Sequence, residues 1–463
     1  MFVKRFYEPL LAQASYLIGC QRTGDAIVID ANRDVDQYIA TAEQEGLRIS
    51  HVTETHIHAD YVSGSQDLAL KVGASLCLSD EGDEHWKYQF PHDRKLKAGD
   101  RILIGNVAID VLHTPGHTPE HLTFLVTDGA AADQPIAAVT GDFIFVGDVG
   151  RPDLLERAAN IKGTMETSAR TLWTSLQKFA AHHDWLQIWP GHGAGSACGK
   201  GISAIPSSTL GYERRFNWAF NAKSEDDFVA RVLSGQPEPP RYFAVMKQVN
   251  KGAVATGTAA ASGRPTLDEV LAQGSLVIDT RPAAAFAESH RHGALNIPLN
   301  GTFLNWAGSL IPYDRDFYII TDRIDDVRRA LSLIGLDRIA GSFPEFTGRG
   351  GGSVPQISAE ELAARLDSVT VVDVRSATEW ATGHLPGAVH MPLGYLPERA
   401  AELPGGRPIV VQCQGGGRSA IGSSLLGHLG HRDVMNLAGG ITAWAAAGLP
   451  IESSEHAPQA TRA

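Results

Sequence analysis

The sequence has few cysteines and no long hydrophobic run. Its 463 residues include four cysteines, Cys20, Cys77, Cys198 and Cys413, which form no CxxC pair. A disulfide-stapled secreted scaffold is therefore not expected, and the pattern favours reduced thiols in a cytoplasmic protein. No apolar stretch approaches the ~20 residues needed to span a bilayer. Because no cleavage site follows Leu10–Cys20, we do not expect a signal peptide there. We expect paired strands at Ser15–Ile18 and Ala26–Asp30, around Gln21–Asp25.

Positive charge is also in short supply. The chain has 40 Lys and Arg against 52 Asp and Glu, for a formal net charge of -12, and no local basic cluster. Nucleic acid and anionic membranes are therefore not expected as partners, since both require a basic surface. The hydrophobic content of 43% is ordinary for a globular protein. Single cores stop growing at roughly 250–300 residues, so we expect two or three domains.

The second half of the chain repeats itself. Asp279-Thr-Arg281 recurs as Asp373-Val-Arg375, and 373 − 279 gives an offset of 94 residues. The same offset relates a further histidine, glycine, alanine, proline and leucine of the two segments: His290, Gly293, Ala294, Pro298 and Leu299 recur as His384, Gly387, Ala388, Pro392 and Leu393. Chance matching at one fixed offset is improbable, so the sequence predicts two copies of one small parallel α/β domain.

These patterns predict an α/β protein of three parts. The first part alternates apolar strands with helical stretches, and a Gly-, Ala-, Ser- and Thr-rich linker follows it. The predicted order is a mixed α/β domain in 1–250, a linker in 251–264, the first copy in 265–350, the second copy in 355–455 and a tail in 456–463.

Metal-ligand residue types follow apolar strands at four places in the first domain. They are His56 after 52–55, His117 after 107–112, Asp142 after 136–140 and His192 after 186–189. Strand ends hold side chains rigidly, while the loops beyond them leave the mouth of a site open. Imidazole and carboxylate groups of this kind suit a non-haem ferrous ion, and they also accept zinc. Four other histidines are predicted to be surface or packing residues: His113, His121, His182 and His183.

These motifs resemble the metallo-β-lactamase fold over roughly the first 230 residues. The run His56-Ile-His58-Ala-Asp60-Tyr61 matches the family's HxHxDH motif except at its last position. Because Tyr61 replaces a histidine, a tight dinuclear zinc centre is not expected. Within the superfamily the chain is similar to persulfide dioxygenases. That resemblance implies one Fe(2+) per chain held by His56, His117 and Asp142, with zinc as the alternative.

The same resemblance implies supporting residues around the metal. Orienting roles fall to His58, Asp60, Tyr61 and His192, and a brace behind Asp142 falls to Arg151 and Asp153. The predicted substrate contacts are Tyr212, Arg214 and Arg215, because a guanidinium matches a carboxylate. A surface salt bridge is an equal alternative for Arg214.

Cys198 stands six residues after His192, beside glycines and Lys200. This setting predicts an exposed, electropositive loop near the metal. The thiol is then either a relay that accepts a persulfide or a small packed residue, and the sequence leaves both open. Cys20 and Cys77 lie in apolar strand-like runs and are expected in the core.

A nucleophile motif follows the apolar strand 409–411. Three glycines let the backbone after Cys413 curl so that its amides face the sulfur. The N-terminus of the following helix and Arg418 add positive charge, which favours a thiolate and a bound persulfide anion. The predicted catalytic residues are Cys413 and Arg418, and the predicted persulfide cradle comprises Gln414, Gly415, Gly416, Gly417 and Ser419.

Residues 355–453 resemble rhodaneses, through Cys-x4-Arg after a strand and the Gly383-His-Leu-Pro-Gly-Ala388 motif. In the first copy, Asp322 stands where Cys413 stands in the second. Asp322 has no thiol and no glycine cradle, so we expect a degenerate, inactive rhodanese-like domain with a structural role.

The whole order resembles persulfide dioxygenase–rhodanese fusions. The resemblance implies an N-terminal αββα sandwich followed by two small parallel-sheet rhodanese-like α/β domains. It also implies that glutathione persulfide and O₂ give sulfite and thiol, and that Cys413 persulfide exchanges sulfur between sulfite and thiosulfate. Two alternatives are a zinc thioester hydrolase of the glyoxalase II type and a non-catalytic sulfur carrier. The sequence does not decide whether the chain forms a homo-oligomer.

Overall fold

The computed structural model describes residues 1–157, 163–252, 257, 259, 265–345 and 351–453. It divides into two compact units, Met1–Thr256 with Ser332–Gly335 and Gly257–Leu331 with Leu336–Ala463. Most of the predicted linker and the whole predicted tail lie outside the described residues, so those domain boundaries stay predictions. Within the described part of the chain, no helix has the length and apolar character needed to cross a membrane.

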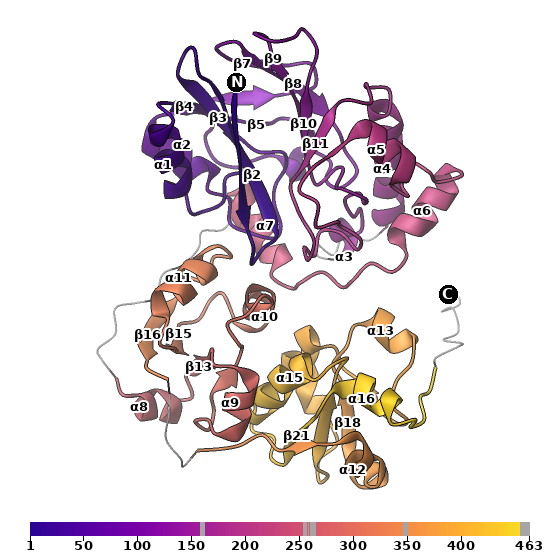
Figure 1. Cartoon of the computed structure of the whole chain (residues 1–463). Coiled ribbons are helices and arrows are strands. Elements are labelled where there is room, and N and C mark those ends of the chain that lie inside the picture. Colours follow the sequence, from indigo (N-terminus) through magenta and orange to yellow (C-terminus); the bar gives the residue numbers. More distant parts are fainter. Residues whose placement is uncertain (158–162, 253–256, 258, 260–264, 346–350, 454–463) are drawn as a thin grey trace. The chain divides into compact units, whose positions relative to one another are not determined.

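Two six-stranded sheets form the first unit (Figure 1). In sheet order, the first contains β1 (Phe2–Glu8), β2 (Gln13–Cys20), β3 (Asp25–Ile29), β4 (Arg48–Thr53), β5 (Ser75–Ser79) and β6 (Arg94–Leu96). The second contains β12 (Ser208–Thr209), β11 (Gln187–Pro190), β10 (Ala137–Gly141), β9 (Leu122–Asp128), β8 (Val107–His113) and β7 (Arg101–Ile104). The predicted pairing of the strands around 21–25 is confirmed, since β2 and β3 are antiparallel.

The two sheets enclose one core and each carries helices on its outer face. Ile18 and Ile27 of the first sheet share a buried cluster with Ile109 and Phe124 of the second. Side chains alternate across a strand, so the opposite faces bury other residues. Helices α1 (Asp36–Gln44) and α2 (Ser65–Val72) cover the first sheet, and α4 (Met165–Phe179) and α6 (Glu225–Leu233) cover the second. The predicted αββα sandwich is confirmed.

Three further α-helices and one 3-10 helix complete the described part of residues 1–252. They are α3 (Leu154–Arg157), α5 (Leu210–Phe216) and α7 (Phe243–Lys251), together with the 3-10 helix η1 at Glu84–Trp86. Helix α7 runs one residue past the predicted domain end at 250.

The second unit contains two small parallel sheets, one for each repeat. The first copy comprises α8 (Leu267–Ala272), β13 (Leu276–Asp279), α9 (Ala283–Glu288), β14 (Leu295–Asn296), α10 (Phe303–Leu310), β15 (Phe317–Ile320), α11 (Ile324–Ser332) and β16 (Ile339–Phe343), with sheet order β14-β13-β15-β16. The second comprises β17 (Gln356–Ile357), α12 (Ala359–Ala363), β18 (Thr370–Asp373), α13 (Ala377–Ala381), β19 (Val389–His390), α14 (Leu396–Arg399), β20 (Ile409–Gln412), α15 (Gly417–His428), β21 (Val434–Leu437) and α16 (Gly440–Ala446), with sheet order β17-β21-β20-β18-β19.

The repeat seen in the sequence is also a repeat of contacts. Arg281 pairs with Asp279 at 2.7 Å, and Arg375 pairs with Asp373 at the same distance. Each arginine also donates to a backbone carbonyl eight residues further along the chain. The two pairs are buried, so each fixes the end of its strand against the next loop. The prediction of two copies of one domain is confirmed.

Helix α15 of the second copy packs against β14 of the first. The Ser424 hydroxyl accepts a hydrogen bond from the Asn296 amide at 3.0 Å. One turn further along, His428 Nδ1 lies 2.6 Å from the Gly293 carbonyl oxygen. Since α15 begins directly after the Cys413 loop, the helix that carries the nucleophile loop also joins the two copies.

Candidate functional sites

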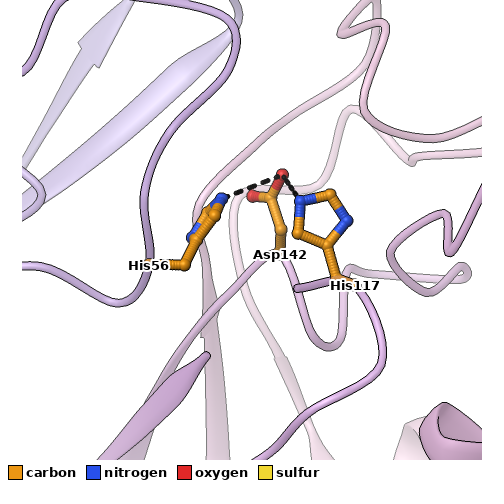
Figure 2. A group of neighbouring side chains, drawn as sticks. All are labelled: His56, His117 and Asp142. Atoms are coloured by element: carbon orange, nitrogen blue, oxygen red, sulfur yellow. Dashed lines mark ion pairs between the residues drawn. The ribbon is translucent and has the colours of Figure 1, made fainter. Parts of the chain in front are cut away.

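Three strand ends bring His56, His117 and Asp142 together (Figure 2). The Oδ2 atom of Asp142 lies 3.5 Å from His117 Nε2 and 4.0 Å from His56 Nε2. All three side chains are buried. Neither carboxylate oxygen of Asp142 has a hydrogen-bond partner among the described residues. A buried carboxylate without partners is costly, so this ligand set fits a bound cation.

The imidazole rings are held so that Nε2 faces the carboxylate. His117 Nδ1 lies 3.0 Å from the Arg151 carbonyl oxygen, and His56 Nδ1 lies 2.9 Å from Thr55 Oγ1. Such contacts on one ring nitrogen are typical of histidines that bind a metal through the other.

Burial also sets the protonation of these rings. The pKa of His56 is far below its usual range because burial and the neighbouring histidines disfavour the charged form. Burial also lowers the pKa of His117, although Asp142 opposes this shift. Both rings are therefore neutral at physiological pH and offer a lone pair to a cation.

His121 supports Asp142, a role that the sequence did not suggest. Its ring is completely buried, and its Nε2 accepts a hydrogen bond from the Asp142 amide at 3.2 Å. Its Nδ1 lies 2.9 Å from Thr114 Oγ1. The prediction of a packing residue is correct as to burial but misses this contact, which fixes the backbone of a metal ligand. One signal was available, because His121 directly precedes an apolar strand within the TPGHTPEH motif.

Asp30 holds His58 and Tyr61 in other contacts. His58 Nε2 lies 3.1 Å from Asp30 Oδ1, and the Tyr61 hydroxyl donates to the Asp30 carbonyl oxygen at 3.3 Å. Burial lowers the pKa of His58, but the carboxylates of Asp30, Glu54 and Asp60 outweigh it and raise the pKa to about 9. Asp30 also accepts a hydrogen bond from the Thr55 amide at 2.7 Å, next to His56. Sequence reasoning missed Asp30.

A second donor set borders Asp142 on its other side. The ligand atoms of Asp60, His192 and Cys198 lie within 4.8 Å of one another. His192 Nε2 is 3.4 Å from Asp142 Oδ1 and 3.3 Å from Asp60 Oδ2. The two oxygens of Asp142 therefore face two different groups of side chains, and the second group combines nitrogen, oxygen and sulfur.

The predicted exposure of Cys198 is wrong. The residue is only 2% exposed. Burial raises the pKa of its thiol well above the usual range, and the carboxylates of Asp142 and Asp60 raise it further. Lys200 points elsewhere, to the carbonyl oxygens of Arg231 and Ser234. The loop is turned inward because Asp148 accepts hydrogen bonds from its amides at positions 200 and 201. The relay role stays a prediction.

The predicted brace between Arg151 and Asp153 is confirmed. Two hydrogen bonds of 2.8 Å join the buried guanidinium and carboxylate. Arg151 also donates to the carbonyl oxygens of Ala197 and Pro237. Since the Arg151 carbonyl contacts His117, this pair ties the Cys198 loop to a metal ligand.

The three predicted substrate residues all lie on α5. Arg214 pairs with Asp184 at 2.8 Å, and both side chains are exposed, which matches the salt-bridge alternative. Arg215 lies over the ring of Phe216, and Tyr212 is 48% exposed. Substrate binding by these three residues stays a prediction.

In the second unit, Cys413 lies between β20 and α15 and is buried. Its Sγ accepts hydrogen bonds from the Gly416 amide at 3.1 Å and from the Ser419 hydroxyl at 3.3 Å. Gly416 has φ +96, a left-handed conformation that favours glycine. The predicted cradle is confirmed at these two residues, whereas the Gln414 side chain donates to Thr442.

Arg418 does not offer Cys413 an unpaired charge, contrary to prediction. Its guanidinium donates two hydrogen bonds to Glu379, at 2.7 and 2.5 Å. Although burial raises the pKa of Glu379, Arg418 and Ser376 outweigh burial and lower it to about 2. Glu379 is therefore ionised and neutralises the guanidinium. The sequence does not indicate this pairing, because the two residues lie 39 positions apart.

Among its described residues, the first copy has no such site. Asp322 is exposed, and its carboxylate accepts a hydrogen bond from the Glu345 amide at 3.0 Å. Helix α11 begins two residues later, with Asp325 and Asp326 in its first turn. The acidic helix start gives an anion no cradle, as predicted.

Two known protein families match this chain, one in each half. A profile of the metallo-beta-lactamase superfamily matches residues 9–192. A profile of the rhodanese-like domain matches residues 358–447.

Relatives with described activities match each half separately. The hydroxyacylglutathione hydrolase of Rhodospirillum rubrum is 30% identical over 38% of this chain, which spans 60% of that protein. The mitochondrial persulfide dioxygenase of Homo sapiens is 28% identical over 42% of this chain and 68% of its own. A sulfurtransferase of Allochromatium vinosum is 40% identical over 22% of this chain and 98% of its own.

A solved structure covers more of this chain than the first unit alone. The crystal structure of a metallo-beta-lactamase from Staphylococcus aureus is 42% identical in sequence, with a TM-score of 0.68. The match covers 74% of this chain and 99% of the other chain.

Proposed function

Because the chain belongs to the metallo-β-lactamase superfamily and carries a C-terminal rhodanese domain, we propose that it is a persulfide dioxygenase joined to a sulfurtransferase. The proposed substrate is a low-molecular-weight thiol persulfide, with glutathione persulfide as the first choice. The persulfide, O₂ and water give the thiol, sulfite and two protons. The few scattered cysteines favour a cytoplasmic setting for this chemistry.

One observation carries the dioxygenase proposal: two neutral imidazoles and an unpartnered carboxylate converge at Asp142. A ferrous ion held by such a set supplies open coordination positions for O₂ and a sulfur anion. The chain's own part is to keep this set fixed. His121 holds the Asp142 backbone, and the Arg151 carbonyl fixes the His117 ring.

The sulfurtransferase proposal rests on the cradle of Cys413. The Gly416 amide and the Ser419 hydroxyl donate to the sulfur, which favours an anion there. Sulfite attacks the outer sulfur of a Cys413 persulfide. The new S–S bond forms thiosulfate, and the old S–S bond breaks to return the Cys413 thiolate.

Single substitutions should separate the two activities. His117→Ala is expected to abolish persulfide-dependent O₂ uptake and to lower bound iron, while thiosulfate sulfurtransferase activity stays within about twofold of wild type. Cys413→Ser is expected to do the reverse. The measurements are O₂-electrode rates, metal content and thiosulfate consumption on the same preparations. Loss of both activities in one folded variant contradicts the two-site assignment.

A thioester hydrolase is the alternative, and the Asp60, His192 and Cys198 group favours it. Those donors, with Asp142 between the two groups, suit a second cation of the kind that metal hydrolases use. The hydrolase of Rhodospirillum rubrum supports the same alternative. Two metal ions per chain, thioester cleavage and no O₂ uptake would select it, whereas one iron with rapid O₂ uptake selects the dioxygenase.

A further inference from the structure

A pocket of about 550 Å³ opens beside Cys413, and the first copy forms most of its wall. Cys413, Arg418 and Ile421 border it from the second copy. The first copy contributes the loop after β13, the segment 298–302 and the start of α10, including Asn305 and Trp306. This volume lies in the range of small-molecule sites.

The first copy gives the pocket amides, hydroxyls and apolar surface but no charge. Its lining residues there are Thr280, Pro282, Ala283, Pro298, Leu299, Asn300, Thr302, Asn305 and Trp306. Arg418 is the one charged residue of the described lining, and its guanidinium is paired with Glu379. The first copy therefore offers an uncharged organic group the indole of Trp306 and the amide of Asn305. The donors to the sulfur come from the second copy, from the Gly416 amide and the Ser419 hydroxyl.

We infer that the first copy forms the subsite for the organic arm of the sulfur donor of Cys413. The donor class is a small thiol persulfide whose arm next to sulfur is uncharged, and thiosulfate has no such arm to place against this wall. This inference rests on the proposed sulfurtransferase function and gives the degenerate copy a role in specificity, beyond packing.

The loading step balances without a further reactant. The Cys413 thiolate attacks the outer sulfur of the donor RS–SH, and a new S–S bond forms at Cys413. The S–S bond of the donor breaks, and RS⁻ leaves with its electron pair. Sulfite then removes the outer sulfur as described above, so no external oxidant or reductant is needed.

Donor kinetics of the full-length chain test the inference. The uncharged probe is N-acetylcysteamine persulfide, and thiosulfate is the dianionic probe. Trp306→Ala is expected to lower kcat/KM for N-acetylcysteamine persulfide about tenfold and to change the thiosulfate value less than twofold. Trp306→Phe should restore most of the loss. Asp322→Ala is the matched control in the same copy, because Asp322 is exposed and does not line the pocket; both donors should react with it as with wild type.

A gain-of-function variant keeps the test decisive if Trp306→Ala fails to fold. Asn305→Lys places a cation at the wall and should raise kcat/KM for thiosulfate at least severalfold. Equal losses for both donors in Trp306→Ala, or no gain in Asn305→Lys, would overturn the inference. If neither probe loads wild-type Cys413, the proposed sulfurtransferase function itself fails.

Discussion

At the residue scale, the metal ligands depend on neighbours that bind no metal themselves. The backbone amide of Asp142 donates a hydrogen bond to His121. Neither carboxylate oxygen of Asp142 has a hydrogen-bond partner among the described residues, so both can bind a cation. Burial keeps the pKa of His121 far below its usual range, so the ring is neutral and its Nε2 can accept that hydrogen bond. The neutral, buried His121 ring therefore fixes the backbone that carries the metal-binding carboxylate.

Replacing His121 should weaken metal binding without touching a ligand. His121→Leu leaves the buried Asp142 amide without an acceptor, which costs about 1–3 kcal/mol. Loss of such supporting contacts lowers metal affinity by roughly 10–100-fold. Competition with a chelator measures the affinity. His182→Leu is the control, because His182 is half-buried against Phe179 and is not part of the metal-ligand set. Equal affinities for the His121 variant and wild type contradict this role.

The Arg418–Glu379 pair makes a prediction about pH. The folded-state pKa of Glu379 is about 2, below its ordinary value of 4.5. The stabilisation is therefore fully present above pH 4.5 and is lost as pH falls through about 2. Both side chains are partly exposed, so we expect only about 0.5–1 kcal/mol. The Tm difference between wild type and Glu379→Gln should be constant from pH 8 to 5 and should shrink at lower pH; a difference that grows on acidification contradicts the assignment.

At the element scale, helix α15 serves two sheets. Its first turn carries Ser419, which donates to Cys413, and its later turns carry Ser424, which meets β14. The helix is rich in small residues on these faces, so both sheets can approach it closely. The same helix therefore links the contact between the copies to the nucleophile loop.

Removing the Ser424 hydroxyl should destabilise this contact. Ser424→Ala leaves the buried Asn296 amide unpaired and should lower the free energy of unfolding of the second unit by about 1–3 kcal/mol. Sulfur transfer should fall with it, while O₂ uptake should not change. Ser423→Ala is the matched control, because its hydroxyl donates only to Met435 within the second copy. Denaturant unfolding and the two activity assays measure the effect; equal behaviour of the two variants would argue against the contact.

At the scale of the whole molecule, the proposed scheme makes sulfite an intermediate of two candidate sites in separate units. Their joining by one chain raises the effective concentration of one site's product at the other, to about mM for short linkers. Neither site needs residues from the other unit in this scheme.

A mixture of single-site variants tests the value of the joining. His117→Ala and Cys413→Ser chains together supply both activities, but on different molecules. At equal activity and ~µM protein, the wild-type chain should release severalfold less free sulfite from a thiol persulfide than the mixture does. Ion chromatography of sulfite and thiosulfate measures this. Identical sulfite yields would show that joining the sites does not channel the intermediate.

The sequence predicted those features of the fold and the site that depend on residues close together in the chain. The strand-end positions of His56, His117 and Asp142 follow from the apolar runs before them, and the resemblance to the metallo-β-lactamase fold implied the sandwich around them. The contacts that the sequence did not predict join distant residues. Asp30 lies 28 residues from His58, and Glu379 lies 39 from Arg418. Periodicity contains no information about such pairs. The glycine-flanked Cys198 loop looked exposed for the same reason, because Asp148 lies 52 residues away from the amides it holds.

The pocket beside Cys413 has a consequence for how this duplicated segment can change over evolutionary time. A copy without its nucleophile would ordinarily be free to diverge or to be deleted. Here Trp306 and Asn305 of the first copy line the cavity beside Cys413. The Asn296 amide of the first copy also donates to Ser424 in helix α15 of the second. We therefore expect drift at Asp322 and its surroundings, and constraint at the residues that face the working cysteine.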